Sequence, residues 1–334
     1  MKPITIADVA KHAGVSKSTV SQYLNQRYDY MGEKTKKRIE QTIEELGYRP
    51  NIIARSLKQK STMTIGVIVA NILHVFSTQV IRAIEDFCNE SNFHIIVCNA
   101  DDDPMKEKRY IEMLRAKQVD GIIAFPTGGN VELYKGLIKV NYPVVFMDRI
   151  LPEVEIPTVL LDNEKASLLA VDQLLKNGYK KIGMIAPPLS PYVTPRLERI
   201  SGYKKALQQH DIPFNPNYLI SSEIFELEAK INHMLTMADP PEALVALNDR
   251  VLIEILKYTK EQQINIPGDL ALVGIDEVSF ASFYSPALTT VAQPAFQMGK
   301  KAAELLLNRI RDKDTDDFSK IYRFEPDLIK RESC

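Results

Sequence analysis

The sequence predicts an α/β protein, in which a small all-α domain precedes a core of two doubly wound parallel-sheet subdomains. Three features of the 334 residues support this prediction. The first 48 residues show helical periodicity interrupted by turn residues, apolar runs typical of buried strands recur from residue 64 onward, and helical patterns lie between most of these runs. Strands that alternate with helices along a chain favour parallel sheets covered by helices on both faces.

Residues 4–25 have the pattern of two short helices joined by a tight turn. Thr5 and Asp8 suit a capping box at the start of the first helix. Gly14 permits the turn, and the Ser16 hydroxyl can cap the second helix by accepting a hydrogen bond from its first turn. This pattern is typical of a helix-turn-helix, whose second helix reads DNA in the major groove. A plain helical hairpin is the alternative.

Residues 33–46 carry apolar side chains at helical spacing, and Gly47 follows them. They predict a third helix that completes the core of a DNA-binding headpiece over residues 1–48. Residues 49–62 are expected to form a hinge helix and linker. Their helical part, residues 51–58, is too short to be stably helical alone.

The charge of the chain is divided unequally. Residues 1–60 contain 12 Lys and Arg against 6 Asp and Glu, a net charge of +6, whereas the whole chain has 42 against 43 and a net charge of −1. Nucleic-acid binding by the amino-terminal part requires such a basic segment on an acidic body. Chance clustering of solvated charges is the alternative.

The core is expected over residues 63–334, as an N-subdomain of about 63–161 and 292–320 and a C-subdomain of about 162–291 and 321–334. Residues 321–333 resemble a closing strand pair. Strands are predicted near 64–70, 93–99, 120–125, 143–148, 181–186, 243–248 and 270–276. Helices are predicted near 78–91, 105–117, 163–177, 196–209, 248–262 and 294–312.

Several function classes lack their sequence signals. Cys88, Cys98 and Cys334 form no disulfide framework or metal motif, and the five histidines lack ligand spacing. Phosphate-binding loops and a nucleophile elbow are missing, as are a signal peptide and an apolar run long enough to span a bilayer. We therefore expect a cytoplasmic protein with no metal, cofactor, membrane partner or enzymatic activity. An enzyme on a doubly wound fold is one alternative.

A series of motifs along essentially the whole chain carries a family resemblance. They are TIADVAKHAGVSKSTVSQYLN, then RPN followed by ARSLK, then TIGVIVANI, VDGIIAF, PVVFMD, LNDRVL, VGIDEVSFASFYSPALTTVAQP and LIKRES. In these motifs the chain resembles the LacI/GalR family of bacterial transcription regulators, which implies a periplasmic-binding-protein-like core. Gly32 stands where many members have a serine cap. RYDYMGEKTKKRI and SLKQKSTMTIGVIVANIL also resemble the subgroup that regulates ketodeoxygluconate and related sugar-acid genes.

The resemblance implies a homodimeric regulator that binds a near-palindromic operator in double-stranded DNA. The resemblance also implies that this regulator represses carbohydrate or sugar-acid utilisation genes. The resemblance places Lys17, Ser18 and Gln22 at base-reading positions, although a phosphate contact is an alternative for Lys17. Five further polar side chains are better placed for phosphate contacts: Thr5, Thr19, Ser21, Asn25 and Thr35. In the hinge, Leu57 would wedge into the minor groove, Ala54 and Arg55 would line it, and Asn51 would begin the helix near a phosphate.

The resemblance also implies a small sugar-like effector in the cleft between the two core subdomains. The expected effector-binding residues are Phe76, Ser77, Asp101, Arg149, Arg196, Arg199, Asn248, Asp276 and Gln293. Arg149 with Arg199 indicates an anionic sugar, since arginine binds carboxylates well; salt bridges inside the core are the alternative. Asp249 is expected to cap the helix that follows it. A solute-binding protein for a sugar, without a DNA-binding role, is the alternative function.

Overall fold

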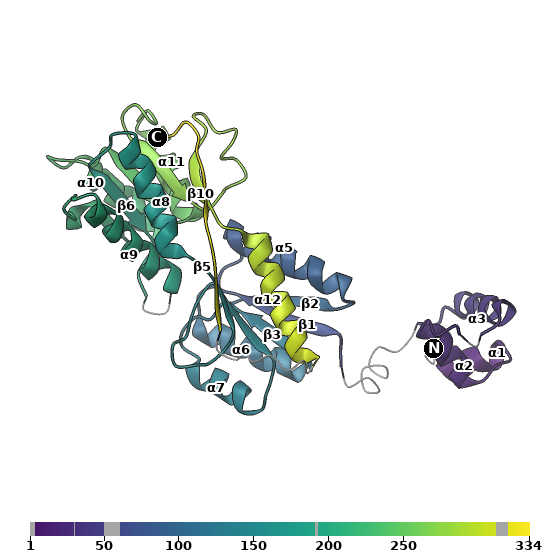
Figure 1. Cartoon of the computed structure of the whole chain (residues 1–334). Coiled ribbons are helices and arrows are strands. Elements are labelled where there is room, and N and C mark those ends of the chain that lie inside the picture. Colours follow the sequence, from purple (N-terminus) through teal and green to yellow (C-terminus); the bar gives the residue numbers. More distant parts are fainter. Residues whose placement is uncertain (1–3, 30, 50–60, 191–192, 312–319) are drawn as a thin grey trace. The chain divides into compact units, whose positions relative to one another are not determined.

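The structure is a computed structural model that describes residues 4–29, 31–49, 61–190, 193–311 and 320–334 (Figure 1). It separates into two compact units, Met1–Thr62 and Met63–Cys334. Four residues expected at the hinge lie outside the described residues: Asn51, Ala54, Arg55 and Leu57.

The described residues of the amino-terminal unit form three helices, α1 (Ile6–His12), α2 (Lys17–Leu24) and α3 (Glu33–Leu46). They enclose a small apolar core of Val9, Ala10, Ala13, Val20, Ile39 and Tyr48. The three helices predicted from the sequence are therefore confirmed. We call this unit the headpiece.

Local capping fixes the ends of the headpiece helices as the sequence predicts. Thr5 and Asp8 form a reciprocal capping box at the start of α1. The Ser16 hydroxyl accepts a hydrogen bond from the Thr19 amide at 3.1 Å at the start of α2. Gly14, in the turn between these helices, has a φ of 61°, which glycine adopts without strain.

The core unit contains two six-stranded sheets, with strand orders β11-β5-β4-β3-β1-β2 and β12-β10-β9-β8-β6-β7. The first sheet consists of β1 (Thr64–Val69), β2 (His94–Asn99), β3 (Gly121–Ala124), β4 (Val144–Met147), β5 (Thr158–Leu161) and β11 (Ile321–Phe324). The second consists of β6 (Ile182–Ala186), β7 (Leu219–Ser221), β8 (Ala243–Ala246), β9 (Ala271–Ile275), β10 (Thr289–Ala292) and β12 (Asp327–Ile329). Among these strands, β10 and β12 pair antiparallel and the other pairs are parallel.

Helices cover both faces of each sheet, so the doubly wound prediction is confirmed (Figure 1). The first subdomain is the first sheet with α5 (Val75–Glu90), α6 (Pro104–Ala116), α7 (Val131–Lys139) and α12 (Ala295–Ile310). The second subdomain is the second sheet with α8 (Asn163–Lys176), α9 (Thr194–Gln209), α10 (Leu227–Leu235) and α11 (Asp249–Glu261), together with the 3₁₀ turns Pro216–Tyr218 and Ile224–Glu226. The central strands are buried on both faces, which explains their uninterrupted apolar sequences.

The closing strand pair predicted at residues 321–333 is wrong. Strand β11 joins the first sheet, where it pairs in parallel with β5. The chain then passes through Glu325 and Pro326, and β12 pairs with β10 in the second sheet. Residues 321–324 therefore belong to the first subdomain, because β11 covers the edge of β5 that would otherwise be unpaired.

The sequence also missed short elements of the core. The missed elements are the strands β5, β7 and β10 and the helices α7 and α10. They are shorter or more polar than the elements that were predicted. In the described part of the chain, no helix is both long and apolar enough to cross a membrane.

Candidate functional site

A pocket opens between the two subdomains, where the carboxyl ends of strands from both sheets meet. It encloses about 510 Å³, its opening to solvent included. Carboxyl ends of parallel strands are where open α/β sheets bind ligands. The lining residues are Ala70, Asn71, His74, Phe76, Ser77, Phe125, Asp148 and Arg149 from the first subdomain, Val193, Pro195, Arg196, Arg199, Leu247, Asn248 and Asp276 from the second, and Gln293 at a crossover.

Most of the residues expected at an effector site line this pocket. They are Phe76, Ser77, Arg149, Arg196, Arg199, Asn248, Asp276 and Gln293. Asp101 is the exception: its side chain is exposed, pairs with Lys106 and accepts a hydrogen bond from the Asn99 amide at 2.6 Å. The next residue, Asp102, faces the arginines instead. That the lining residues bind an effector stays a prediction.

Arg149 and Arg196 approach each other from opposite subdomains. Arg149 is 6% exposed and its Nη2 lies 2.7 Å from Asp102 Oδ1. The Nη2 of Arg196 lies 3.6 Å from Asp102 Oδ2, and its Nη1 donates to the Pro188 carbonyl at 2.7 Å. Within the described residues, Arg149 Nε has no hydrogen-bond partner. Burial lowers the pKa of Arg196, which Asp102 partly opposes.

Arg199 is fixed by neutral groups of its own subdomain. Its Nε donates to Asn163 Oδ1 at 2.9 Å and its Nη1 to the Leu247 carbonyl at 2.8 Å. Two acids, Asp148 and Asp276, lie nearby. Burial raises the pKa of each carboxyl, and the positive charge of Arg199 opposes this rise. Both aspartates have a left-handed backbone, with φ values of 68° and 88°. Such strain is concentrated at functional sites, where surrounding structure holds it in place.

A chain of polar contacts joins the two subdomains beside the pocket. Asp249 Oδ1 lies 2.6 Å from His74 Nδ1, and Asp249 Oδ2 accepts a hydrogen bond from the Val75 amide at 2.7 Å. The Asp249 amide donates to Asp276 Oδ2 at 3.2 Å, and the Gln293 amide group donates to Asp276 Oδ1. We call the Asp249 contacts to His74 and Val75 the latch.

Asp249 is not the N-cap of its own helix, although its Oδ1 accepts a hydrogen bond from the Arg250 amide in the first turn at 2.8 Å. Asn248 is the N-cap of α11, because its Oδ1 accepts from the Val251 amide at 3.0 Å. Asp249 also binds the first amide of α5 through its Oδ2, across the boundary between the subdomains. The interaction spans 174 residues of sequence, so no local pattern could have revealed it.

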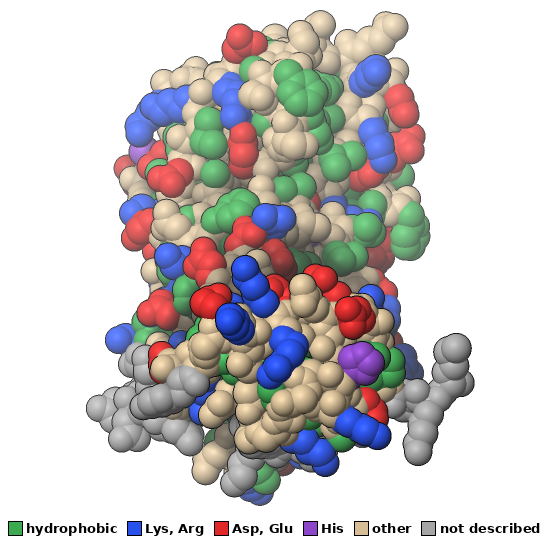
Figure 2. All heavy atoms as spheres, turned by 90° about the vertical axis from the view of Figure 1, so that its right-hand side faces the viewer, with side chains coloured by type: hydrophobic (Ala, Val, Ile, Leu, Met, Phe, Trp, Pro, Cys, Tyr) green, Lys and Arg blue, Asp and Glu red, His purple; other side chains and the backbone are tan. Residues whose placement is uncertain are grey.

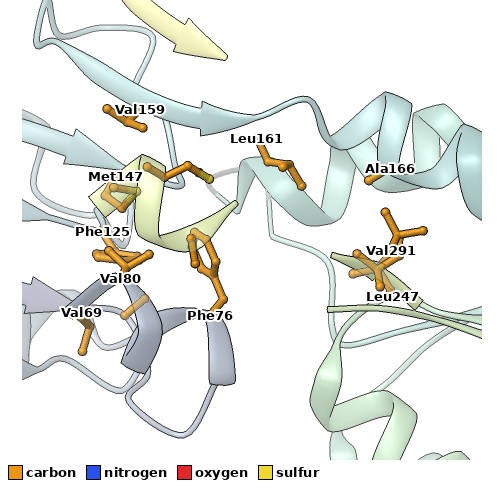
Figure 3. Packing of buried hydrophobic residues seen from close by; sticks show 14 of the residues in the cluster. Val69, Phe76, Val80, Phe125, Met147, Val159, Leu161, Ala166, Leu247 and Val291 are labelled. Carbon is orange, nitrogen blue, oxygen red and sulfur yellow. The ribbon is translucent and has the colours of Figure 1, made fainter. Parts of the chain in front are cut away.

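An aromatic pair forms an apolar wall of the pocket. Phe76 and Phe125 meet edge to face, with ring centroids 6.3 Å apart. Figure 3 shows the two rings beside Met147 and Val80 in the core of the first subdomain, with Leu247 and Val291 on the opposite side. An apolar wall facing charged groups suits a polyhydroxy ligand that has one less polar face.

The sequence missed four polar residues at or beside the pocket: Asn71, His74, Asp102 and Asp148. A signal existed for Asp148, which directly follows the buried strand β4 as Asp276 follows β9. For His74 and Asp102 the deciding contacts come from distant parts of the chain.

Eight of the residues expected to contact DNA lie in the described part of the headpiece, and five of these are exposed. Four of the exposed side chains lie on α2 or at its C-cap: Lys17, Ser18, Gln22 and Asn25. Lys and Arg side chains stand among neutral polar ones on the headpiece face that Figure 2 presents. The fifth exposed residue is Thr5, the N-cap of α1, whereas the side chains of Thr19, Ser21 and Thr35 are half-buried.

Local hydrogen bonds already occupy part of this surface. The Ser16 hydroxyl lies within hydrogen-bond distance of the Ser18 and Thr19 hydroxyls, at 2.6 and 2.8 Å. Asn25 donates to the Ser21 carbonyl at 2.7 Å. Lys17 and Gln22 have no side-chain hydrogen-bond partner in the described part of the chain, which leaves both free for a ligand.

Comparison with known proteins decides the family. A family model described as "Bacterial regulatory proteins, lacI family" matches residues 5–51, and one described as "Periplasmic binding protein-like domain" matches residues 171–334. The probable HTH-type transcriptional regulator EndR of Paenibacillus polymyxa is 51% identical over 332 residues, or 98% of each chain. The chain belongs to the lacI family of bacterial regulatory proteins. This lacI-family regulator is thus a DNA-binding transcriptional regulator with an effector-binding core, and not an enzyme.

Other relatives support the family without selecting an effector. The regulator KdgR of Bacillus subtilis is 33% identical over 92% of this chain and 91% of its own. The repressor PurR of Aliivibrio salmonicida is also 33% identical, over 98% of both chains. A structure titled as the Lac repressor bound to ONPG in the repressed state is 26% identical, has a TM-score of 0.87 and matches the full length of both chains. The alternative of a solute-binding protein without a DNA-binding role does not fit these relatives.

Proposed function

We propose that this lacI-family regulator is a repressor of carbohydrate or sugar-acid utilisation genes, and that its effector is a sugar acid. The observation that carries the proposal is the set of three arginines, Arg149, Arg196 and Arg199, at one pocket. Planar guanidinium groups bind carboxylates with two parallel hydrogen bonds, which a neutral sugar cannot match. Arg149 Nε, which has no partner in the described residues, is available to such a ligand.

The other lining groups suit the hydroxyls of a sugar. Asp148 and Asp276 can accept hydrogen bonds from hydroxyls, and Gln293 Oε1 is buried without a partner among the described residues. Asn248 uses its oxygen to cap α11, so its side-chain nitrogen remains for a ligand. Buried polar atoms without partners are costly, and a ligand that satisfies them gains affinity.

In this proposal the regulator acts as a homodimer in the cytoplasm. Each headpiece places α2 in a major groove of a near-palindromic operator, where Lys17, Ser18 and Gln22 read bases.

The proposed control runs through residues 51–58. A helix of eight residues needs the partner helix and DNA to persist, so a core rearrangement that separates the two copies lowers operator affinity. A coupling of about 1–3 kcal/mol changes affinity about 5–150-fold.

Calorimetric titration of the wild-type protein tests the effector class with matched ligands. Galacturonate is compared with galactose, and glucuronate with glucose, because each acid differs from its neutral partner in having a carboxylate at C6. We expect at least one acid to bind about tenfold or more tightly than its neutral partner, since a hydrogen bond to a charged group contributes about 1.5–3 kcal/mol. Tighter binding of a neutral sugar than of its acid would contradict the proposal.

A further inference from the structure

Asp102 holds the two pocket arginines together, but its contacts with them are imperfect. Asp102 Oδ1 lies 2.7 Å from Arg149 Nη2, yet this oxygen has no well-directed hydrogen bond. Asp102 Oδ2 lies 3.6 Å from Arg196 Nη2, beyond ordinary hydrogen-bond distance. A bidentate carboxylate partner would satisfy both guanidinium groups better than Asp102 does.

Asp102 also bridges the two subdomains. Arg149 follows β4 in the first subdomain, whereas Arg196 lies on α9 in the second. The two cations would repel each other without an anion between them, because both are largely removed from water. The carboxylate of Asp102 therefore supplies the negative charge that this junction requires.

The loop that carries Asp102 can release it at little cost to the core. Its side chain is 33% exposed and does not line the pocket. Asp101 and Asp102 both have left-handed backbones, with φ values of 53° and 56°. The carboxylate is thus held by charge at the end of a strained turn and is not packed into the interior.

We infer that Asp102 is a built-in anion that occupies the Arg149–Arg196 pair when no effector is bound, and that an acidic effector competes with it for this pair. The inference rests on the proposed function, because it assumes a ligand that carries a carboxylate. Asp102 then has a regulatory role: it lowers the affinity of the pocket for acidic ligands and leaves the affinity for neutral ligands unchanged.

Thermal unfolding of the full-length protein in sodium sulfate tests the inference without knowledge of the effector. Sulfate replaces chloride at constant ionic strength, and wild type is compared with Asp102→Asn. The variant frees the arginine pair, so sulfate should raise its unfolding midpoint by about 2 °C more than that of wild type. Asparagine tolerates left-handed backbone angles, and Asp102→Gly, which fits them without strain, serves as a second variant with the same expected response.

Two further variants are matched controls. Asp101→Asn makes the same charge change in the same turn, but Asp101 pairs with Lys106, so its sulfate response should equal that of wild type. Adding Arg149→Met to Asp102→Asn should abolish the extra response, because one half of the anion site is then gone. General stabilisation by sulfate is common to all variants and cancels in these comparisons.

Equal sulfate responses of wild type, Asp101→Asn, Asp102→Asn and Asp102→Gly would overturn the inference. The proposed function fails on a different result, namely wild type that binds neutral sugars in preference to their acids. If galacturonate or glucuronate binds wild type, Asp102→Asn should bind that acid about tenfold more tightly and bind the neutral partner with unchanged affinity. Weaker binding of the acid by Asp102→Asn would show that Asp102 assists the ligand, which also overturns the inference.

Discussion

Replacing Asp249 with alanine should open the cleft of the core. The Asp249 side chain is 3% exposed and is bonded to His74 at 2.6 Å and to the Val75 amide at 2.7 Å, both in the other subdomain. A hydrogen bond to a charged group contributes about 1.5–3 kcal/mol. Two such bonds are not independent, so we expect a loss of about 3 kcal/mol for the latch as a whole.

This loss should be visible in both stability and ligand binding. For a core of this size, about 3 kcal/mol corresponds to a fall of about 6–12 °C in the unfolding midpoint. Effector affinity should also weaken, by up to about 100-fold, because the pocket needs walls from both subdomains and the closed population falls. Differential scanning calorimetry and titration of the same preparations measure the two effects. His74→Asn, which keeps a donor near the position of Nδ1, is the matched control and should lose much less.

The latch also predicts a pH dependence with a definite sign. Burial alone raises the pKa of the Asp249 carboxyl, but the His74 and Val75 hydrogen bonds outweigh it, so this pKa lies below its ordinary value of 3.8. A lowered pKa gives stability that is present above pH 3.8 and is lost as pH falls through the folded-state pKa. The difference in stability between wild type and Asp249→Ala should therefore shrink as the pH falls below about pH 4. Burial raises the pKa of Asp276 and the Asp249 charge raises it further, so Asp276 contributes to this difference. Equal midpoints at neutral pH, or a difference that acid leaves unchanged, would refute the reasoning.

Three other substitutions test separate parts of the proposal. Arg149→Met should weaken binding of an acidic effector about 10–150-fold, from the loss of about 1.5–3 kcal/mol, and should leave operator binding intact; an unchanged effector response by titration would remove Arg149 from the site. Gln22→Ala should relax preference at one operator base pair by about 1–3 kcal/mol in competition gel shifts, and equal weakening at every sequence would make Gln22 a backbone contact. Leu57→Ala, at a position outside the described residues, should strongly weaken operator binding in gel shifts while the core keeps its unfolding midpoint, and unchanged affinity would discard the minor-groove wedge.

Sequence reasoning located the regular elements because burial on both faces leaves a clear pattern. The runs that became β1, β6 and β9 are almost continuously apolar, as their positions in the middle of the sheets require. Strand β11 shows the limit. It lies close to β12 in sequence, but the free edge of β5 determines its partner. Adjacency in sequence therefore gave a pairing that the sheets do not have.

In the pocket, too, some residues could be predicted from the sequence and others could not. Arg149 lies two residues after the end of the buried strand β4, so its position at the carboxyl edge of the sheet could be predicted from the order of strands along the chain. Asp101 could not be distinguished from Asp102, because two successive left-handed residues decide which carboxylate faces the arginines. His74 gave no signal, since its partner Asp249 lies on another subdomain.

The central claim is that the headpiece binds DNA and that a ligand in the core controls this binding. Fluorescence anisotropy of a labelled fragment of the protein's own promoter region, titrated with protein in low salt, tests it most directly. With the acid identified by calorimetry present or absent, we expect specific binding whose affinity changes about 5–150-fold. Binding no tighter than to random DNA, or an affinity that the acid does not alter, would contradict the account.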